Sequence, residues 1–286
     1  MENIYNILRG VVDMHIHTAP DVFERRVNDI EAVRQAKEVG MRAILLKCHQ
    51  TLTADRAWLV AKMEPGIEVF GALCLDVASC GGINVEAVKV ALKLGAKEIW
   101  MPTIDAVNHL KYYGGNLENA VEVLTKNENL KPEMEQILKL IAESNVILGT
   151  GHLSPRETEI LVDEAKKIGV KKILVTHPEF EAIKMPVETQ KKLVKKGAIM
   201  EYCFFSVVHL GFLGRRTLIS PAELASQIRE VGAEHCVMST DFGNIFLPPP
   251  IEGMRMYISS MKAQGISQRE IDIMVKENPS KLLDLK

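Results

Sequence analysis

Short apolar segments alternate with amphipathic charged segments along the whole chain, and this alternation constrains the fold more than any other feature. The apolar segments are rich in β-branched residues and occupy residues 10–15, 42–47, 67–73, 98–101, 146–150, 172–176, 198–202 and 235–240. Near-continuous apolar segments of this kind are typical of strands buried on both faces, as in a parallel sheet. We therefore predict an α/β fold, a (β/α)8 TIM barrel with a parallel eight-stranded core, and an open doubly wound sheet is the alternative.

Helix signals occupy the segments between these predicted strands. The segment from Asp29 carries apolar residues at helical spacing and stops at Gly40. Ser-Pro-Arg-Glu at 154–157 and Ser-Pro-Ala-Glu at 220–223 each combine an N-cap serine, a proline at the first helical position and a glutamate at the third. No linker-like segment interrupts the pattern, so we predict one domain over residues 1–286, with an extended segment after strand four at 105–129.

The composition indicates which classes of binding partner and which cellular compartment to expect. The 35 Lys and Arg residues against 37 Asp and Glu residues argue against nucleic acid or an anionic membrane as a partner. The longest apolar run, 203–213, is too short to cross a bilayer, and the N-terminus does not resemble a signal peptide. Five scattered cysteines without a CxxC pair fit a reducing compartment. We expect a cytoplasmic protein acting on a small molecule, and the sequence leaves a homo-oligomer open.

Potential metal ligands recur at the ends of the predicted strands. They are His15, His17, His49, His152, His177 and Asp241. In a barrel all these strand ends meet at one mouth, where active sites lie. Imidazole and carboxylate ligands together favour a divalent ion, zinc first, with iron, manganese or nickel as alternatives. A lone histidine is more often structural, and we interpret His109, His209 and His235 in that way.

The order of these residues resembles a known family. Asp-Met-His-Ile-His at 13–17, His152, His177 and Ser-Thr-Asp at 239–241 together resemble the amidohydrolase superfamily of metal-dependent hydrolases, as does the tail 277–283. The resemblance covers essentially the whole chain and indicates a divergent subfamily. It implies that His15, His17 and Asp241 hold a metal together with His152. It also implies that His177 completes a second metal site or polarises the substrate carbonyl.

The end of the fourth predicted strand departs from that family. Many binuclear members carry a bridging lysine or glutamate there, whereas residues 100–103 of this chain read Trp-Met-Pro-Thr. We therefore expect one ion, with two ions as the alternative.

Lys47 and His49 alternate at the end of the second predicted strand, so both can face the lumen while Leu46 and Cys48 pack outward. Lys47 has three candidate uses: binding an anionic substrate, transferring a proton, or serving as a bridge relocated from strand four. An ion pair with Glu201 is the structural alternative. His49, Glu201 and Arg25 are further candidates for a ligand or a substrate contact, and Arg25 is otherwise a solvated loop charge.

The expected mechanism follows from the metal. A bound divalent ion lowers the pKa of its water to about 7. Asp241 is expected to accept the water's proton and pass it to the leaving group, while His177 or the metal stabilises the oxyanion. The expected function is hydrolysis of an amide, ester, lactone or C–N bond in a small, anionic substrate. A decarboxylase or lyase on the same single-metal site and a catalytically silent metal-binding barrel are the alternatives.

Overall fold

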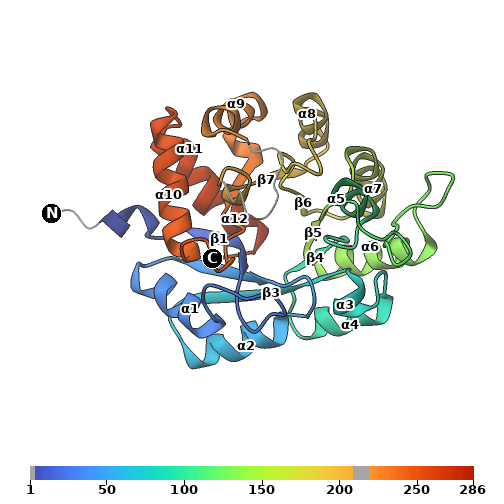
Figure 1. Cartoon of the computed structure of the whole chain (residues 1–286), viewed down its shortest axis with the longest axis horizontal. Coiled ribbons are helices and arrows are strands. Elements are labelled where there is room, and N and C mark those ends of the chain that lie inside the picture. The colour runs from blue at the N-terminus through green and yellow to red at the C-terminus, as the bar shows by residue number, and fades with distance from the viewer. Residues whose placement is uncertain (1–3, 209–218) are drawn as a thin grey trace.

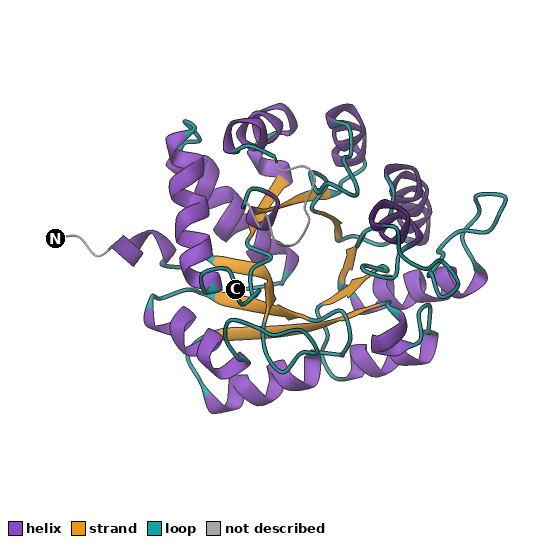
Figure 2. Ribbon diagram, in the orientation of Figure 1, coloured by secondary structure: helices purple, strands orange, loops and turns teal. Residues whose placement is uncertain are grey.

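Eight parallel strands form a single sheet in chain order. The computed structural model describes residues 4–208 and 219–286. The strands are β1 (Val12–His17), β2 (Ala43–Lys47), β3 (Glu68–Cys74), β4 (Glu98–Trp100), β5 (Ile147–Gly149), β6 (Ile173–Thr176), β7 (Ile199–Cys203) and β8 (Cys236–Ser239). They curve into a nearly closed barrel with helices on the outside (Figures 1 and 2). The predicted (β/α)8 TIM barrel and all eight predicted strands are confirmed.

Helices follow most strands and cover the outside of the barrel. The α-helices are α1 (Asp29–Glu38), α2 (Ala54–Met63), α3 (Val77–Cys80), α4 (Val85–Lys93), α5 (Val107–Tyr113), α6 (Pro132–Ser144), α7 (Pro155–Ile168), α8 (Val187–Lys195), α9 (Pro221–Val231), α10 (Pro250–Ala263), α11 (Gln268–Asp272) and α12 (Asn278–Leu282). Shorter turns are η1 (Ile4–Leu8), η2 (Phe204–Ser206), η4 (Ala233–His235) and the π-helical η5 (Ile273–Glu277). The predicted N-caps Ser154 and Ser220 both form capping boxes, with Glu157 and Glu223.

The barrel has two apolar cores, one inside the lumen and one between strands and helices. Leu45 packs in the lumen with Val12, Met14 and Trp100, whereas Leu46 packs in the outer core. This alternation follows from the pleat of a strand, whose successive side chains point to opposite faces. The predicted outward orientation of Leu46 is confirmed.

Strand β1 does not keep this alternation throughout. Its pairing register with β2 shifts between Asp13 and Ile16. Met14 packs in the lumen, yet Ile16 packs in the outer core. The irregularity exchanges the two faces of the strand, as an extra residue in a bulge does. As a result His15 and His17 both point into the mouth of the barrel above Met14.

Backbone hydrogen bonds join the end of β1 to the segment after β8. The Asp241 amide donates to the His15 carbonyl, and the His17 amide donates to the Phe242 carbonyl, both at 2.8 Å. Gly243 lies so close to the His17 backbone that a Cβ atom there would collide with the His17 carbonyl oxygen. Glycine at this position therefore lets the segment after β8 approach the paired histidines.

The extended segment predicted after strand four is present and contains α5, which lies near the mouth of the barrel. Asn108 of α5 donates through Nδ2 to the carbonyls of His152 and Ala182, at 3.1 and 2.9 Å. These bonds attach α5 to the loops that follow β5 and β6.

Among the described helices, none has the length and apolar character needed to cross a membrane. His209 and residues 209–213 of the apolar run lie outside the described residues.

Candidate metal centre

Two histidines and one carboxylate converge at the mouth of the barrel. The Nε2 atoms of His15 and His17 lie 3.0 and 3.1 Å from Oδ1 of Asp241. The two histidines end β1 and Asp241 follows β8. Two imidazole nitrogens and a carboxylate oxygen this close together form a donor set suited to a transition metal. The structure thus brings together three of the five predicted ligands.

His152 and His177 lie on the adjoining wall rather than in this cluster. Both line the same cavity as His17 and Asp241, but neither joins the close group of donor atoms found among the described residues. Nδ1 of His152 faces Nδ1 of His109 at 2.8 Å. Nδ1 of His177 is buried and has no hydrogen-bond partner in the described part of the chain. The described residues thus leave one buried hydrogen-bonding atom of this cavity-lining histidine unused.

His177 and Asp241 also share an uncommon backbone conformation. Their φ angles are +27° and +54°, in the region that non-glycine residues rarely adopt. Such conformations cluster at functional sites because the surrounding structure must hold them in place. His177 directly follows β6 and Asp241 comes two residues after the end of β8, so the two turns direct their side chains into the mouth.

Burial sets the charge state of the donor atoms. It is the largest cause of the strongly lowered pKa values of His17, His152 and His177, which keeps these imidazoles neutral and able to bind a metal. Burial alone would raise the pKa of Asp241, but His15 and His17 hold it well below its usual value. Burial also acts to lower the pKa of His15, but the carboxylates of Asp241 and Glu201 raise it above its usual value. The centre therefore offers a neutral His17 imidazole and an ionised carboxylate, and a metal at His15 would displace a proton.

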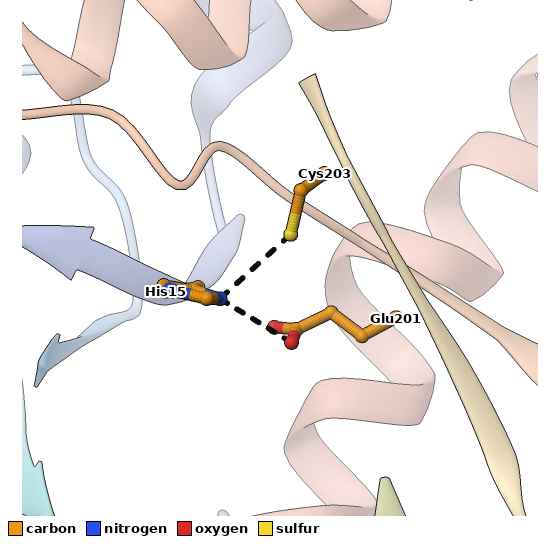
Figure 3. Close-up of side chains that lie close together, drawn as sticks. All are labelled: His15, Glu201 and Cys203. Atoms are coloured by element: carbon orange, nitrogen blue, oxygen red, sulfur yellow. Dashed lines mark hydrogen bonds and ion pairs between the residues drawn. The ribbon is translucent and has the colours of Figure 1, made fainter. Parts of the chain in front are cut away.

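The other nitrogen of His15 is held from β7. Nδ1 of His15 lies 3.3 Å from Oε2 of Glu201 and 3.7 Å from Sγ of Cys203 (Figure 3). A carboxylate on this side accepts a hydrogen from Nδ1, so that Nε2 is the nitrogen that faces Asp241 and Lys47. Glu201 thus contacts a predicted ligand from behind, and Cys203 is a neighbour that the sequence did not indicate.

Lys47 lies on the opposite side of the same ring. Its Nζ atom is 2.9 Å from Nε2 of His15 and 5.0 Å from the centre of the Trp100 ring. The ion pair with Glu201 considered from the sequence is not formed, because Glu201 contacts Nδ1 while Lys47 contacts Nε2. The buried Lys47 ammonium lies at the cluster itself. Its three other candidate uses, in substrate binding, proton transfer or bridging, stay predictions.

Arg25 is not a solvated loop charge. Its guanidinium contacts Oδ2 of Asp21 at 2.8 Å and Nδ1 of His17 at 3.2 Å. The Arg25 side chain is only 8% exposed and lines the cavity. Asp21, which no sequence signal singled out, fixes this arginine beside the paired histidines.

His49 is positioned by a chain of hydrogen bonds. Nδ1 of His49 lies 2.7 Å from the Thr103 hydroxyl, which in turn donates to Asp76. The backbone amide of Thr103 also donates to Asp76, at 2.8 Å. Because the only hydroxyl hydrogen of Thr103 goes to Asp76, the Thr103 oxygen accepts from His49. The His49 Nε2 atom is then an acceptor.

Two other histidines were interpreted from the sequence as structural. His109 lines the cavity and contacts His152 but joins none of the close groups of donor atoms among the described residues, so its interpretation stays a prediction. His235 lies in η4 and contacts Glu234 at 3.9 Å.

Strand β4 does carry a glutamate, Glu98, but at its first residue. Burial raises the Glu98 pKa well above its usual value. The charged residue within an apolar segment was the signal that could have identified it.

A cavity of about 320 Å³ opens beside the cluster. It is lined by His17, Arg25, Lys47, His49, Ile104, His109, Tyr113, His152, His177, Phe180, Phe205, Asp241 and Asn244. A larger hollow of about 420 Å³, bordered by α8 and α9, contains none of the clustered donors. The clustered donor atoms therefore border the smaller cavity.

Comparison with known families places the chain in one of them. A family model matches residues 10–201, and its description is a family of unknown function, DUF6282. The chain belongs to DUF6282. The match includes His15, His17, Lys47 and Glu201, whereas Asp241 lies beyond it. No curated protein matches this DUF6282 member.

Solved structures share the fold of this DUF6282 chain at low sequence identity. An amidohydrolase from Pseudomonas aeruginosa is 13% identical, with a TM-score of 0.64 over 98% of this chain and 97% of that one. The probable dipeptidase PvdM from the same organism is 9% identical, with a TM-score of 0.67 over 98% and 96%. The 2,6-dihydroxybenzoate decarboxylase from Rhizobium is 12% identical, with a TM-score of 0.52 over 97% and 99%. These matches confirm the resemblance to the amidohydrolase superfamily at the level of the fold.

Proposed function

We propose that the chain is a metal-dependent hydrolase that cleaves an amide, ester, lactone or C–N bond of a small molecule. The observation that carries this proposal is the convergence of His15 Nε2, His17 Nε2 and Asp241 Oδ1 at the cavity. Zinc is the first candidate ion, and His15, His17 and Asp241 would hold it. A bound divalent ion would supply an activated water at neutral pH.

The side chains around the cluster have separate tasks in this proposal. Asp241 accepts a proton at its carboxylate and returns it to the leaving group. Because the pKa of Asp241 is low, the carboxylate holds this proton only transiently. His177, which lines the cavity, contacts the oxygen of the substrate that becomes negative. Glu201 keeps the His15 ring oriented from behind.

A decarboxylase or lyase reaction on the same centre is the second candidate. It is favoured by Lys47, a buried cation within 2.9 Å of His15, which could transfer a proton to a substrate carbon. A decarboxylase is also among the solved structures with this fold. Release of carbon dioxide, compared with release of acid or ammonia, separates the two reactions.

The first experiment measures metal by plasma mass spectrometry on protein purified without chelator or a metal-binding tag. We expect about one equivalent of a transition metal per chain, lost in His17→Gln and retained in the matched control His235→Gln. About two equivalents would indicate a second ion, and Lys47 would then be examined for carboxylation. Failure to bind metal on reconstitution would overturn the proposal. Metal-loaded protein that is inert on broad amide, ester, lactone and carboxylic acid panels would instead indicate a silent metal-binding barrel.

A further inference from the structure

Arg25 is an almost buried cation in the wall of the cavity. It lies in the loop after β1, and its side chain is 8% exposed. A guanidinium stays charged in proteins, and burying a charge is costly unless the charge is paired and hydrogen-bonded. The contacts of Arg25 therefore show how much of its hydrogen-bonding capacity the protein itself uses.

Among the described residues, the protein hydrogen-bonds two of the three guanidinium nitrogens, and the Phe23 ring lies over the group with its centre 5.6 Å from Cζ. Nε donates to Oδ2 of Asp21, and Nη2 contacts Asp21 and Nδ1 of His17. Within residues 4–208 and 219–286, no group accepts a hydrogen bond from Nη1. Since Arg25 lines the cavity, this nitrogen is open to a bound molecule. Asp21 is completely buried behind the arginine and fixes its direction.

The rest of the cavity has a charge and a shape that suit an organic anion. Among its described lining residues Arg25 and Lys47 are cations, and Asp241 is the one carboxylate. Asp241 is already engaged by His15 and His17. Apolar and aromatic side chains complete the wall, from Ile104, Tyr113, Phe180 and Phe205. A pocket of this kind binds an apolar body and orients it through a few polar groups.

We propose that Arg25 binds the carboxylate of the substrate through Nη1, so that the substrate is a small carboxylic acid with an apolar body. This inference rests on the proposed function, because it names the substrate class of the same cavity. Asp21 acts as a positioning residue that holds the guanidinium in place. A charge-assisted hydrogen bond to a carboxylate is among the stronger polar contacts in proteins.

Calorimetric titration with two probes of equal shape tests the proposal without any need for turnover. Benzoate and benzamide differ in charge but not in size, and both are titrated into metal-loaded protein. We expect benzoate to bind about tenfold or more tightly than benzamide. Arg25→Gln should remove this preference, while Arg26→Gln should keep it. Arg26 is the matched control because it is the adjacent arginine, is exposed and does not line the cavity.

Two results would overturn the proposal. One is equal binding of benzoate and benzamide to the wild-type protein, a comparison that needs no variant and so stands even if Arg25→Gln does not fold. The other is an undiminished preference for benzoate in folded Arg25→Gln, which would assign the carboxylate to Lys47 or to the metal. An Arg25-dependent preference in a protein without hydrolytic turnover would support this inference and contradict the proposed hydrolase, so the two failures are distinguishable.

Discussion

Glu201 contacts Nδ1 of His15 at 3.3 Å, on the side of the ring opposite to the Asp241 carboxylate. The two residues come from β7 and β1, far apart in the sequence and on separate strands of the barrel. The contact gives His15 a fixed orientation before any ion binds, because its Nδ1 hydrogen already has an acceptor.

Replacing Glu201 with glutamine should weaken metal binding by about 10- to 100-fold, because the charged partner of His15 is lost while the size of the side chain is kept. The measurement is competition for the metal with a chelator of known affinity. Cys203→Ala is the matched control, since Cys203 also faces Nδ1 of His15 but at 3.7 Å and without a charge. Unchanged affinity in Glu201→Gln would show that this contact does not support the centre.

Asp241→Asn should keep most of the metal and lose turnover by a factor of about 100 to 10,000, the usual contribution of a proton-transferring group. The amide oxygen can still face His15 and His17, but it cannot accept a proton. Metal content and turnover are measured on the same preparation. Asp284→Asn, at a surface ion pair with Lys172, should change neither. Full turnover in metal-loaded Asp241→Asn would remove Asp241 from the mechanism.

Thr103→Val should destabilise the protein by about 1–3 kcal/mol, since Asp76 loses a donor and His49 loses its acceptor while the side-chain volume is nearly kept. Urea denaturation measures the free energy of unfolding. The control is Thr158→Val, a buried threonine of α7 outside the cavity. If both variants are equally stable, the hydrogen-bond chain to His49 contributes nothing to the fold.

Glu179 makes stability depend on pH. Burial raises its pKa from 4.5 to about 8, opposed by a hydrogen bond from the Cys203 amide. Between these values the folded chain keeps a proton that the unfolded chain releases, so the free energy of unfolding falls as pH rises from about 4.5 to about 8. The slope from this group is about 1.4 kcal/mol per pH unit.

Glu179→Gln should remove that slope, because glutamine stays neutral at every pH in the window. Urea denaturation at several pH values between 5 and 8 measures it, with the exposed Glu86→Gln as the control. A Glu179→Gln variant with the wild-type pH dependence would show that the carboxyl is ionised in the folded protein.

The strands and the clustered ligands were predictable because both follow from short-range patterns. An apolar segment followed by a histidine marks the end of a buried strand, and the barrel then gathers those ends at one mouth. His15, His17 and Asp241 meet in this way. The roles assigned to them stay predictions.

The partners of these residues were not predictable, because they depend on side-chain directions rather than on spacing. Asp76 and Thr103 follow different strands, and nothing in either segment indicates that both support His49. The opposite sides of the His15 ring taken by Lys47 and Glu201 likewise depend on the orientation of a single imidazole. His109 lines the cavity because its helix is attached to the loops at the mouth through Asn108, a contact that spacing does not indicate.

The register shift in β1 adds one residue to the face of the strand that lines the barrel. Removing Met14 would still leave a segment able to pair with β2. Regular alternation would then run from Asp13 through His15 and Ile16 to His17, so the pleat would keep the two imidazoles toward the mouth and lose only the apolar side chain beneath them. In a lineage of such barrels, a one-codon insertion at this point would thus fill the lumen below the imidazoles while leaving their direction unchanged.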